Sequence, residues 1–122
     1  MPRSVDLFIE SQDPLETLAE SVSGIEGVTV TAVEEGRCLV QDGEVRAVLG
    51  VHRLAGEGEL ALGRYRYAAC AEVPDTVRPQ DSTQAVLLRK VAQRLQEKSS
   101  ATVLMVLDLQ YRGKLDHPEV HA

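Results

Sequence analysis

The sequence is poor in aromatic residues: it has no tryptophan, one phenylalanine and three tyrosines among 122 residues. Aliphatic side chains must therefore build the core of a chain whose length is typical of one domain. It has only two cysteines, Cys38 and Cys70, and their spacing matches no Cys-x-x-Cys motif. We expect both to be small apolar core residues in a reducing compartment.

Long apolar runs are also missing. The longest, 103–107, is far shorter than the about 20 apolar residues that span a bilayer. The first residues show no charged-then-apolar leader, so we expect a cytoplasmic protein. The sequence also lacks asparagine, and this absence beside abundant alanine, valine, glutamate and arginine suggests a GC-rich bacterial coding bias.

Acidic residues outnumber basic ones in the sequence. Nineteen acidic residues against thirteen basic ones give a formal net charge of -6. Such a charge repels phosphate backbones and anionic lipid headgroups at long range. We therefore expect neither nucleic acid nor membrane surfaces as partners.

The first part of the sequence predicts a strand and a short helix. Apolar and acidic residues alternate over 5–10, apart from Phe8 on the second face. Asp13 followed by Pro14 predicts a helix start, with the carboxylate as N-cap and proline at the first helical position. Gly24 predicts a left-handed helix end.

The middle of the sequence predicts a three-stranded meander. A period of two runs over 28–40, with a bulge expected at Glu35–Gly36. Asp42–Gly43 predicts a two-residue hairpin turn, because these residue types tolerate positive φ. The return strand is expected over 44–54 and a third extended segment over 60–73.

The last part predicts a second helix and an interior strand. The residues Asp81–Gln84 resemble a capping box, and an apolar stripe then continues to about Lys98. Residues 102–109 are apolar on both faces, which is typical of an interior strand. We predict one domain over 1–115 and a flexible tail over 116–122.

The predicted order is β-α-β-β-β-α-β. It gives an α+β two-layer sandwich, in which a five-stranded mixed sheet carries two helices on one face. This outline resembles the ferredoxin-like, split β-α-β class with one extra strand. That class hosts many unrelated activities, so the resemblance implies architecture only.

Several patterns suggest chemistry but fit a plain structural role better. The glycine-rich segment 56–63 lacks the Gly-Lys-Ser/Thr of a phosphate-binding loop and carries two glutamates. His117 and His121 have metal-ligand spacing, but Pro118 lies between them and only Asp116 and Glu119 could add ligands locally. We predict no metal, no cofactor and no catalytic residue, and leave enzymatic activity open with a non-enzyme preferred.

Two carboxylates lie near the ends of predicted strands. If the first and last strands were neighbours, Glu10 and Asp108 could approach each other and shift each other's pKa. Solvated strand ends are the preferred interpretation, and Asp13 is expected to cap its helix.

The segment 64–67 has the sequence Arg-Tyr-Arg-Tyr. On a strand, this alternation places both arginines on one side and both tyrosines on the other. An ordinary amphipathic strand is the preferred interpretation, and a cationic binding patch is the alternative. The predicted binding residues are Phe8, His52, Arg64, Tyr65, Arg66 and Tyr67.

The strongest functional signal is surplus apolar residues. Two short helices cover one sheet face, yet Phe8, Val48 and the strand 102–109 place apolar groups on the other. We therefore predict a small acidic protein-binding module, such as an adaptor, chaperone or immunity-type inhibitor, acting through that face. The alternative is a homodimeric small-ligand-binding protein or cofactor-free enzyme with a cavity between sheet faces. Curling of the sheet could also bury part of the surplus.

Overall fold

The computed structural model describes residues 3–34, 36–51 and 65–107, which form one antiparallel sheet and two helices. The helices are α1 (Leu15–Ser23) and α2 (Thr83–Ser99), and a short 3-10 helix, Pro79–Asp81, precedes α2. The strands are β1 (Arg3–Glu10), β2 (Val28–Glu34), β3 (Arg37–Asp42), β4 (Val45–Val51), β5 (Tyr67–Val73) and β6 (Thr102–Leu107). Their order in the sheet is β2-β3-β4-β5-β1-β6.

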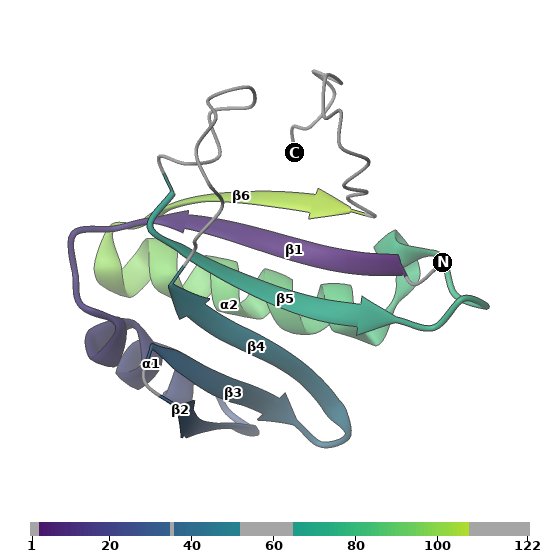
Figure 1. Ribbon diagram of the computed structural model, residues 1–122, viewed down its shortest axis with the longest axis horizontal. Coiled ribbons are helices and arrows are strands. Elements are labelled where there is room, and N and C mark those ends of the chain that lie inside the picture. Colours follow the sequence, from purple (N-terminus) through teal and green to yellow (C-terminus); the bar gives the residue numbers. More distant parts are fainter. Residues whose placement is uncertain (1–2, 35, 52–64, 108–122) are drawn as a thin grey trace.

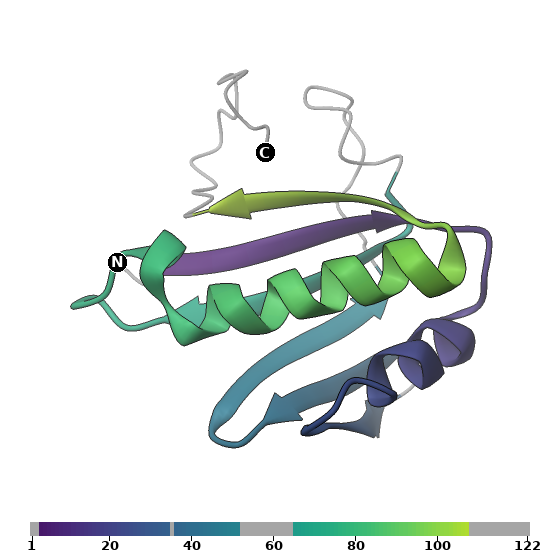
Figure 2. The same ribbon diagram turned by 180° about the vertical axis from the view of Figure 1, so that it is seen from behind.

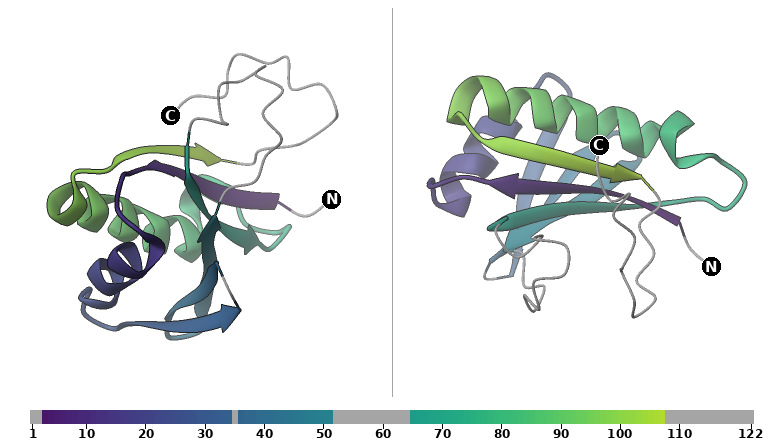
Figure 3. Two further views of the ribbon diagram at one scale, coloured as in Figure 1. Left: turned by 60° about the vertical axis from the view of Figure 1, so that its left-hand side comes forward. Right: turned by 90° about the horizontal axis from the view of Figure 1, so that it is seen from above.

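Both helices lie on the same face of the sheet. Figure 1 looks onto the sheet with the helices behind it, and Figure 2 shows the helices in front. The edge-on view in Figure 3 shows α1 and α2 on one side only. The predicted α+β arrangement is therefore confirmed, and no helix in the described ranges is long and apolar enough to cross a membrane.

The predicted five-stranded mixed sheet is wrong. The segment expected to be one bulged strand over 28–40 is a hairpin of β2 and β3, in which Glu34 pairs with Arg37. Gly36 has φ +82 at this turn, a backbone conformation that glycine adopts without steric cost. All neighbouring strands are antiparallel, and the ferredoxin-like order is not matched.

The second hairpin forms where it was expected but is displaced by one residue. Asp42 pairs with Val45, so the two turn residues are Gly43 and Glu44 rather than Asp42 and Gly43. Gly43 takes the first turn position with φ +65. Glycine at that position is typical of a two-residue hairpin turn, because it accepts positive φ.

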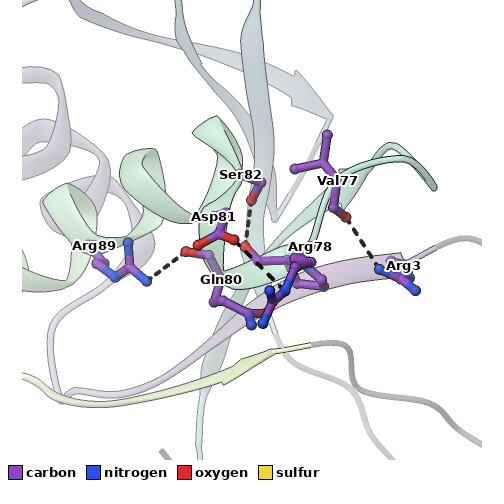
Figure 4. Close-up of polar contacts among 8 residues, drawn as sticks. Arg3, Val77, Arg78, Gln80, Asp81, Ser82 and Arg89 are labelled. Carbon is purple, nitrogen blue, oxygen red and sulfur yellow. Dashed lines mark hydrogen bonds and ion pairs between the residues drawn. The ribbon is translucent and has the colours of Figure 1, made fainter.

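Helix α2 starts within the predicted segment Asp81–Gln84, but Ser82 alone is its cap and the capping box is not formed. The Ser82 side chain accepts a hydrogen bond from the Ala85 backbone N–H at 3.0 Å and donates one to the Pro79 carbonyl at 2.7 Å. Arginines from two elements also hold this segment (Figure 4): Arg3 of β1 donates to the Val77 carbonyl and Arg89 of α2 to the Gln80 carbonyl. The chain entering α2 is thus fixed from both sides.

Helix α1 ends at Gly24 as predicted and begins one residue after the predicted Pro14, but the predicted chemistry of both caps is wrong. Pro14 occupies the N-cap position without a side-chain cap, and the Asp13 carbonyl instead accepts a hydrogen bond from the Tyr67 hydroxyl at 2.6 Å. Gly24 has φ -79 and is not left-handed. A Cβ there would collide with the guanidinium of Arg94, whose Nε donates to the Ser21 carbonyl at 2.8 Å. Glycine at position 24 therefore permits the approach of α2 to the end of α1.

The main core lies between the sheet and the helices. Strand alternation directs every second residue toward this layer, and the apolar stripes of both helices pack against these side chains. The largest fully buried members are Leu7, Ile9, Leu18, Leu49, Leu87, Leu88 and Leu95.

Candidate functional site: the open face of the sheet

The sheet face that points away from α1 and α2 is called the open face here. Cross-strand pairing aligns a row of residues on it: Thr31, Leu39, Val48, Cys70, Asp6 and Val106. A second aligned row contains Arg37, Gly50, Ala68, Phe8 and Leu104. The centre of the open face is therefore mainly apolar, and the described elements place no helix over it (Figure 1).

Small residues make a trough in the middle of the open face. Gly50, Ala68 and Cys70 on β4 and β5 lie between larger side chains on β3 and on β1. A hollow of about 700 Å³ lies here and is also lined by Leu39 and Val48. Its lining includes Ala47, Ala71 and Gln84 of α2 as well, so it extends into the opening where β4 and β5 no longer pair. Such a hollow can accept apolar groups that project from a bound molecule.

The β1–β6 edge of the open face is packed. Phe8 is 2% exposed and Val106 is 6% exposed, and both belong to a small cluster separate from the main core. The Tyr65 ring lies 6.1 Å from the Phe8 ring, measured between centroids. The accessible apolar surface therefore lies over β3, β4 and β5, where Leu39, Val48 and Ala68 are half-buried.

Asp6 and Cys70 form a polar centre beside the trough. The Ser4 hydroxyl donates to the Asp6 carboxylate at 2.8 Å, and the Cys70 thiol also hydrogen-bonds to that carboxylate. Burial raises the pKa of Asp6 above 3.8. Burial and, after it, the Asp6 charge raise the pKa of the Cys70 thiol to about 12. The thiol therefore stays protonated at neutral pH, which makes it a poor nucleophile.

Only part of the predicted binding set meets on the open face. Phe8 and Tyr65 pack together there, whereas Tyr67 is buried on the helix side. The predicted placement of both tyrosines on one side is thus wrong, because the regular alternation of β5 begins only at Tyr67. His52 and Arg64 lie outside the described residues.

Arg66 lies at the sheet end near the start of α1. Its guanidinium donates to the carbonyls of Ser11 and Gln12 at 3.5 and 3.4 Å and lies over the Tyr67 ring at 5.8 Å. Arg66 is exposed, but these contacts direct it toward its own chain rather than toward the trough.

Sequence patterns missed the polar centre. Both cysteines were predicted to be core residues, which is correct for Cys38 but wrong for Cys70, which is exposed. Strand alternation would have placed Cys70 with Ala68, opposite Tyr67, if the start of β5 had been known. The sequence around Asp6 does not indicate that Cys70 is its partner, because the pairing of β1 with β5 joins segments that are distant in the sequence.

The topology does not favour the alternative in which Glu10 and Asp108 approach each other, over which solvated strand ends are preferred. Strands β1 and β6 are neighbours but antiparallel, so their carboxyl ends lie at opposite ends of the sheet. Glu10 pairs with Thr102 at the start of β6.

Other candidate residues cannot be placed. Asp108, the glycine-rich segment 56–63 and the residues 116–122, including both terminal histidines, lie outside the described residues. Within the described ranges, no group of three or more His, Cys, Asp or Glu side chains is arranged to hold a metal ion.

A second hollow lies on the helix side, between α1 and the β2–β3 hairpin. It has a volume of about 600 Å³, and its lining includes Ala19, Val30 and Cys38. It exists because the nine-residue α1 covers only the beginning of β2, where Val28 alone is buried. Its lining also includes Glu16, Glu20 and Glu34.

Comparison of the chain with protein-family models, with curated proteins and with solved structures found no match.

Proposed function

We propose that this chain is a protein-binding module and that the open face of its sheet is the binding surface. The observation that carries the proposal is the row of accessible apolar residues, Leu39, Val48 and Ala68, around the central trough. Accessible apolar surface of this kind, flanked by polar groups, is typical of association sites.

The polar groups of the face support binding rather than covalent chemistry. The Asp6 carboxylate accepts hydrogen bonds from Ser4 and Cys70, and the thiol of Cys70 remains protonated. Arg37, Arg46 and Glu72 border the hollow. Charged side chains at the rim of an apolar centre give specificity to an encounter between proteins.

A small apolar ligand is the second candidate. The hollow of about 700 Å³ has the volume of a small-molecule site, and its floor of glycine, alanine and cysteine leaves room for a ligand. One experiment separates the two candidates.

The test places a photo-reactive benzoyl-phenylalanine at Val48 and, as a matched control, at Val86. Both are valines, but Val48 lies at the trough and Val86 is 47% exposed on the outer side of α2. Irradiation in the native cell should link position 48 to a protein of defined mass, while position 86 gives no such product. Unlabelled wild-type chain should compete with the product, and chain carrying Val48→Lys should not.

The outcomes discriminate between the candidates. A small adduct at position 48, in place of a protein, would support the ligand alternative. Equal products from both positions, or products that the Val48→Lys chain suppresses as well as wild type does, would contradict binding through the open face.

A further inference from the structure

The charges of the open face are divided between its two halves. Arg37 and Arg46 lie on β3 and β4, whereas Asp6 and Glu72 lie on β1 and β5. Arg37 is paired with Glu34 at 2.9 Å. In the described part of the chain, neither Arg46 nor Glu72 makes an ion pair, and they lie on opposite sides of the line between β4 and β5.

The line between β4 and β5 is also the midline of the sheet, with three strands on each side. A two-fold axis along this line, between two stacked open faces, would place β4 over β5 of the second copy and β3 over its β1. The half that carries Arg46 would then meet the half that carries Glu72. An interface of this kind uses the same surface patch on both subunits.

We propose that the open face binds a second copy of this chain, sheet against sheet, across a two-fold axis along the midline between β4 and β5. This inference rests on the proposed function and names its partner. Two sheets that pack face to face keep their strands within about 30° of each other and lie about 10 Å apart. The symmetry brings Arg46 opposite Glu72 of the partner subunit twice, once in each direction.

The register supports the same axis. Val48 and Cys70 are paired across β4 and β5, so they are equidistant from the midline. Val48 of one subunit therefore lies over Cys70 of the other. Arg46 and Glu72 each lie two residues beyond this pair on the same face, past the last paired residues of β4 and β5. The charged contact would thus lie beside the apolar one, at the end of the sheet where β4 and β5 no longer pair.

The outline of the sheet sets the upper limit of such an interface. Six strands spaced about 4.8 Å apart and about 20 Å long outline roughly 500 Å² in projection. Side-chain relief adds to the accessible area, and a stable interface needs about 800 Å² on each partner. The outline is smaller than that, and its β1–β6 part is already packed within the subunit, where Phe8 is 2% exposed, so a weak dimer is expected.

The charge pattern favours a second copy over a uniformly basic partner. The net charge of -6 would attract a basic protein at long range. A basic protein would however face Arg46 at the rim of the trough, and like charges across an interface cost binding free energy. Among the described residues of the face, Arg46 on one side of the midline and Glu72 on the other make no ion pair, so the face is complementary to itself.

The test is a charge-exchange experiment read by sedimentation equilibrium. Arg46→Glu and Glu72→Arg should each raise the dimer dissociation constant by about tenfold or more, since like charges then face each other twice. An equimolar mixture of the two variants should form a 1:1 heterodimer with near wild-type affinity, because both opposite-charge contacts return. Within each variant chain, positions 46 and 72 carry charges of the same sign. The restored affinity of the mixture must therefore come from contacts between subunits.

Two further variants locate the contact. Val48→Lys should weaken the dimer by about 100-fold, because it places an unpaired charge in the interface, and Val86→Lys on α2 should leave it unchanged. A wild-type chain that stays monomeric up to high micromolar concentration would overturn the inference. So would a dimer that tolerates Val48→Lys, or single charge variants that fail to restore association when mixed.

Failure of this inference is distinguishable from failure of the proposed function. A monomeric chain whose position 48 still crosslinks to a different protein keeps the binding function and excludes the second copy. A chain whose position 48 crosslinks to nothing, and whose association does not depend on Val48, loses both.

Discussion

Asp6 and Cys70 lie side by side on β1 and β5, and each changes the ionisation of the other. The carboxylate accepts a hydrogen bond from the thiol, and its negative charge opposes thiolate formation. The open face therefore carries an exposed cysteine that reacts slowly.

The first prediction concerns this reactivity. With a pKa of about 12, Cys70 should be alkylated by iodoacetamide at pH 8 roughly 50-fold more slowly than a thiol of pKa 9.0, because its lower thiolate fraction is partly offset by the greater nucleophilicity of a more basic thiolate. Asp6→Asn removes the neighbouring charge and should raise the rate measurably, although burial, the larger cause of the raised pKa, remains. Mass spectrometry of the native protein in a Cys38→Ser background measures this rate.

Glu72→Gln is the matched control, because the Glu72 charge is the smallest of the causes that raise the Cys70 pKa. It should accelerate alkylation much less than Asp6→Asn does. An equal acceleration by both variants, or fast alkylation of the wild-type protein, would show that the Asp6–Cys70 contact does not form.

The second prediction is a pH dependence of stability. Burial raises the pKa of Asp6 above 3.8, so the unfolded chain ionises before the folded one as pH rises. Asp6 therefore lowers the free energy of unfolding as pH rises from about 3.8 through its raised pKa, and the loss stays constant above it. The stability gained by Asp6→Asn, measured by urea unfolding, should grow over this pH range and then level off.

Asp75→Asn, at an exposed position in the turn after β5, is the control for this measurement. If the difference between wild type and Asp6→Asn shrinks as pH rises, the Asp6 carboxyl is not destabilised by burial.

Single residues show where sequence patterns were informative. Phe8 was predicted on the second sheet face from the break in the apolar alternation of its strand, and it lies there. Tyr65 was assigned to the wrong face relative to Tyr67, because alternation holds only inside a strand and β5 starts at Tyr67. Local pattern thus gave the face of a residue only where the strand boundary was known.

At the scale of elements, α2 is fixed at its start by a side-chain cap that local sequence could predict. Ser82 is 2% exposed, and its hydroxyl both accepts from Ala85 and donates to the Pro79 carbonyl. Its two bonds hold the 3-10 helix against the first turn of α2.

The third prediction follows from this cap. Ser82→Ala should lower the free energy of unfolding by about 1–2 kcal/mol, because the Ala85 N–H and the Pro79 carbonyl lose a buried partner. Thr83→Ala, one residue further and exposed, should change stability by less than about 0.5 kcal/mol. Equal effects of the two substitutions in urea unfolding would contradict the role of Ser82 as the cap.

The contact between α1 and α2 leads to the fourth prediction. Gly24→Ala should destabilise the protein, because its Cβ would displace the Arg94 guanidinium from the Ser21 carbonyl. In an Arg94→Ala background the same substitution should become neutral or stabilising by about 0.5 kcal/mol, since Gly24 has φ -79, which alanine readily adopts. A double-mutant cycle in urea measures this change of sign, and additive effects would contradict the contact.

The ends of α1 show why sequence patterns fail at such contacts. Asp13 has the residue type of an N-cap and Gly24 that of a left-handed end, yet long-range partners decide both positions. Tyr67 binds the Asp13 carbonyl from 54 residues away, and Arg94 reaches the end of α1 from α2. The cap of α2 was predictable because its partners lie within three residues.

For the whole molecule, the alternation of polar and apolar residues predicted the layers but not the number of strands. The two-residue period of apolar side chains continues through a tight turn just as it does through a bulge. The pattern therefore predicts one strand over 28–40. The antiparallel order depends on pairing between distant segments, which periodicity does not contain. The sequence nevertheless predicts the surplus of apolar residues on the second face, because two helices can cover only one face of the sheet.

The central claim for the whole molecule is that the open face becomes covered when the protein associates. Hydroxyl-radical footprinting measures this directly, by comparing oxidation rates of Leu39 and Val48 with that of Val86 in dilute and in associated protein. The rates at Leu39 and Val48 should fall several-fold on association while the rate at Val86 stays constant. Unchanged oxidation of Leu39 and Val48 in the associated protein would contradict the claim.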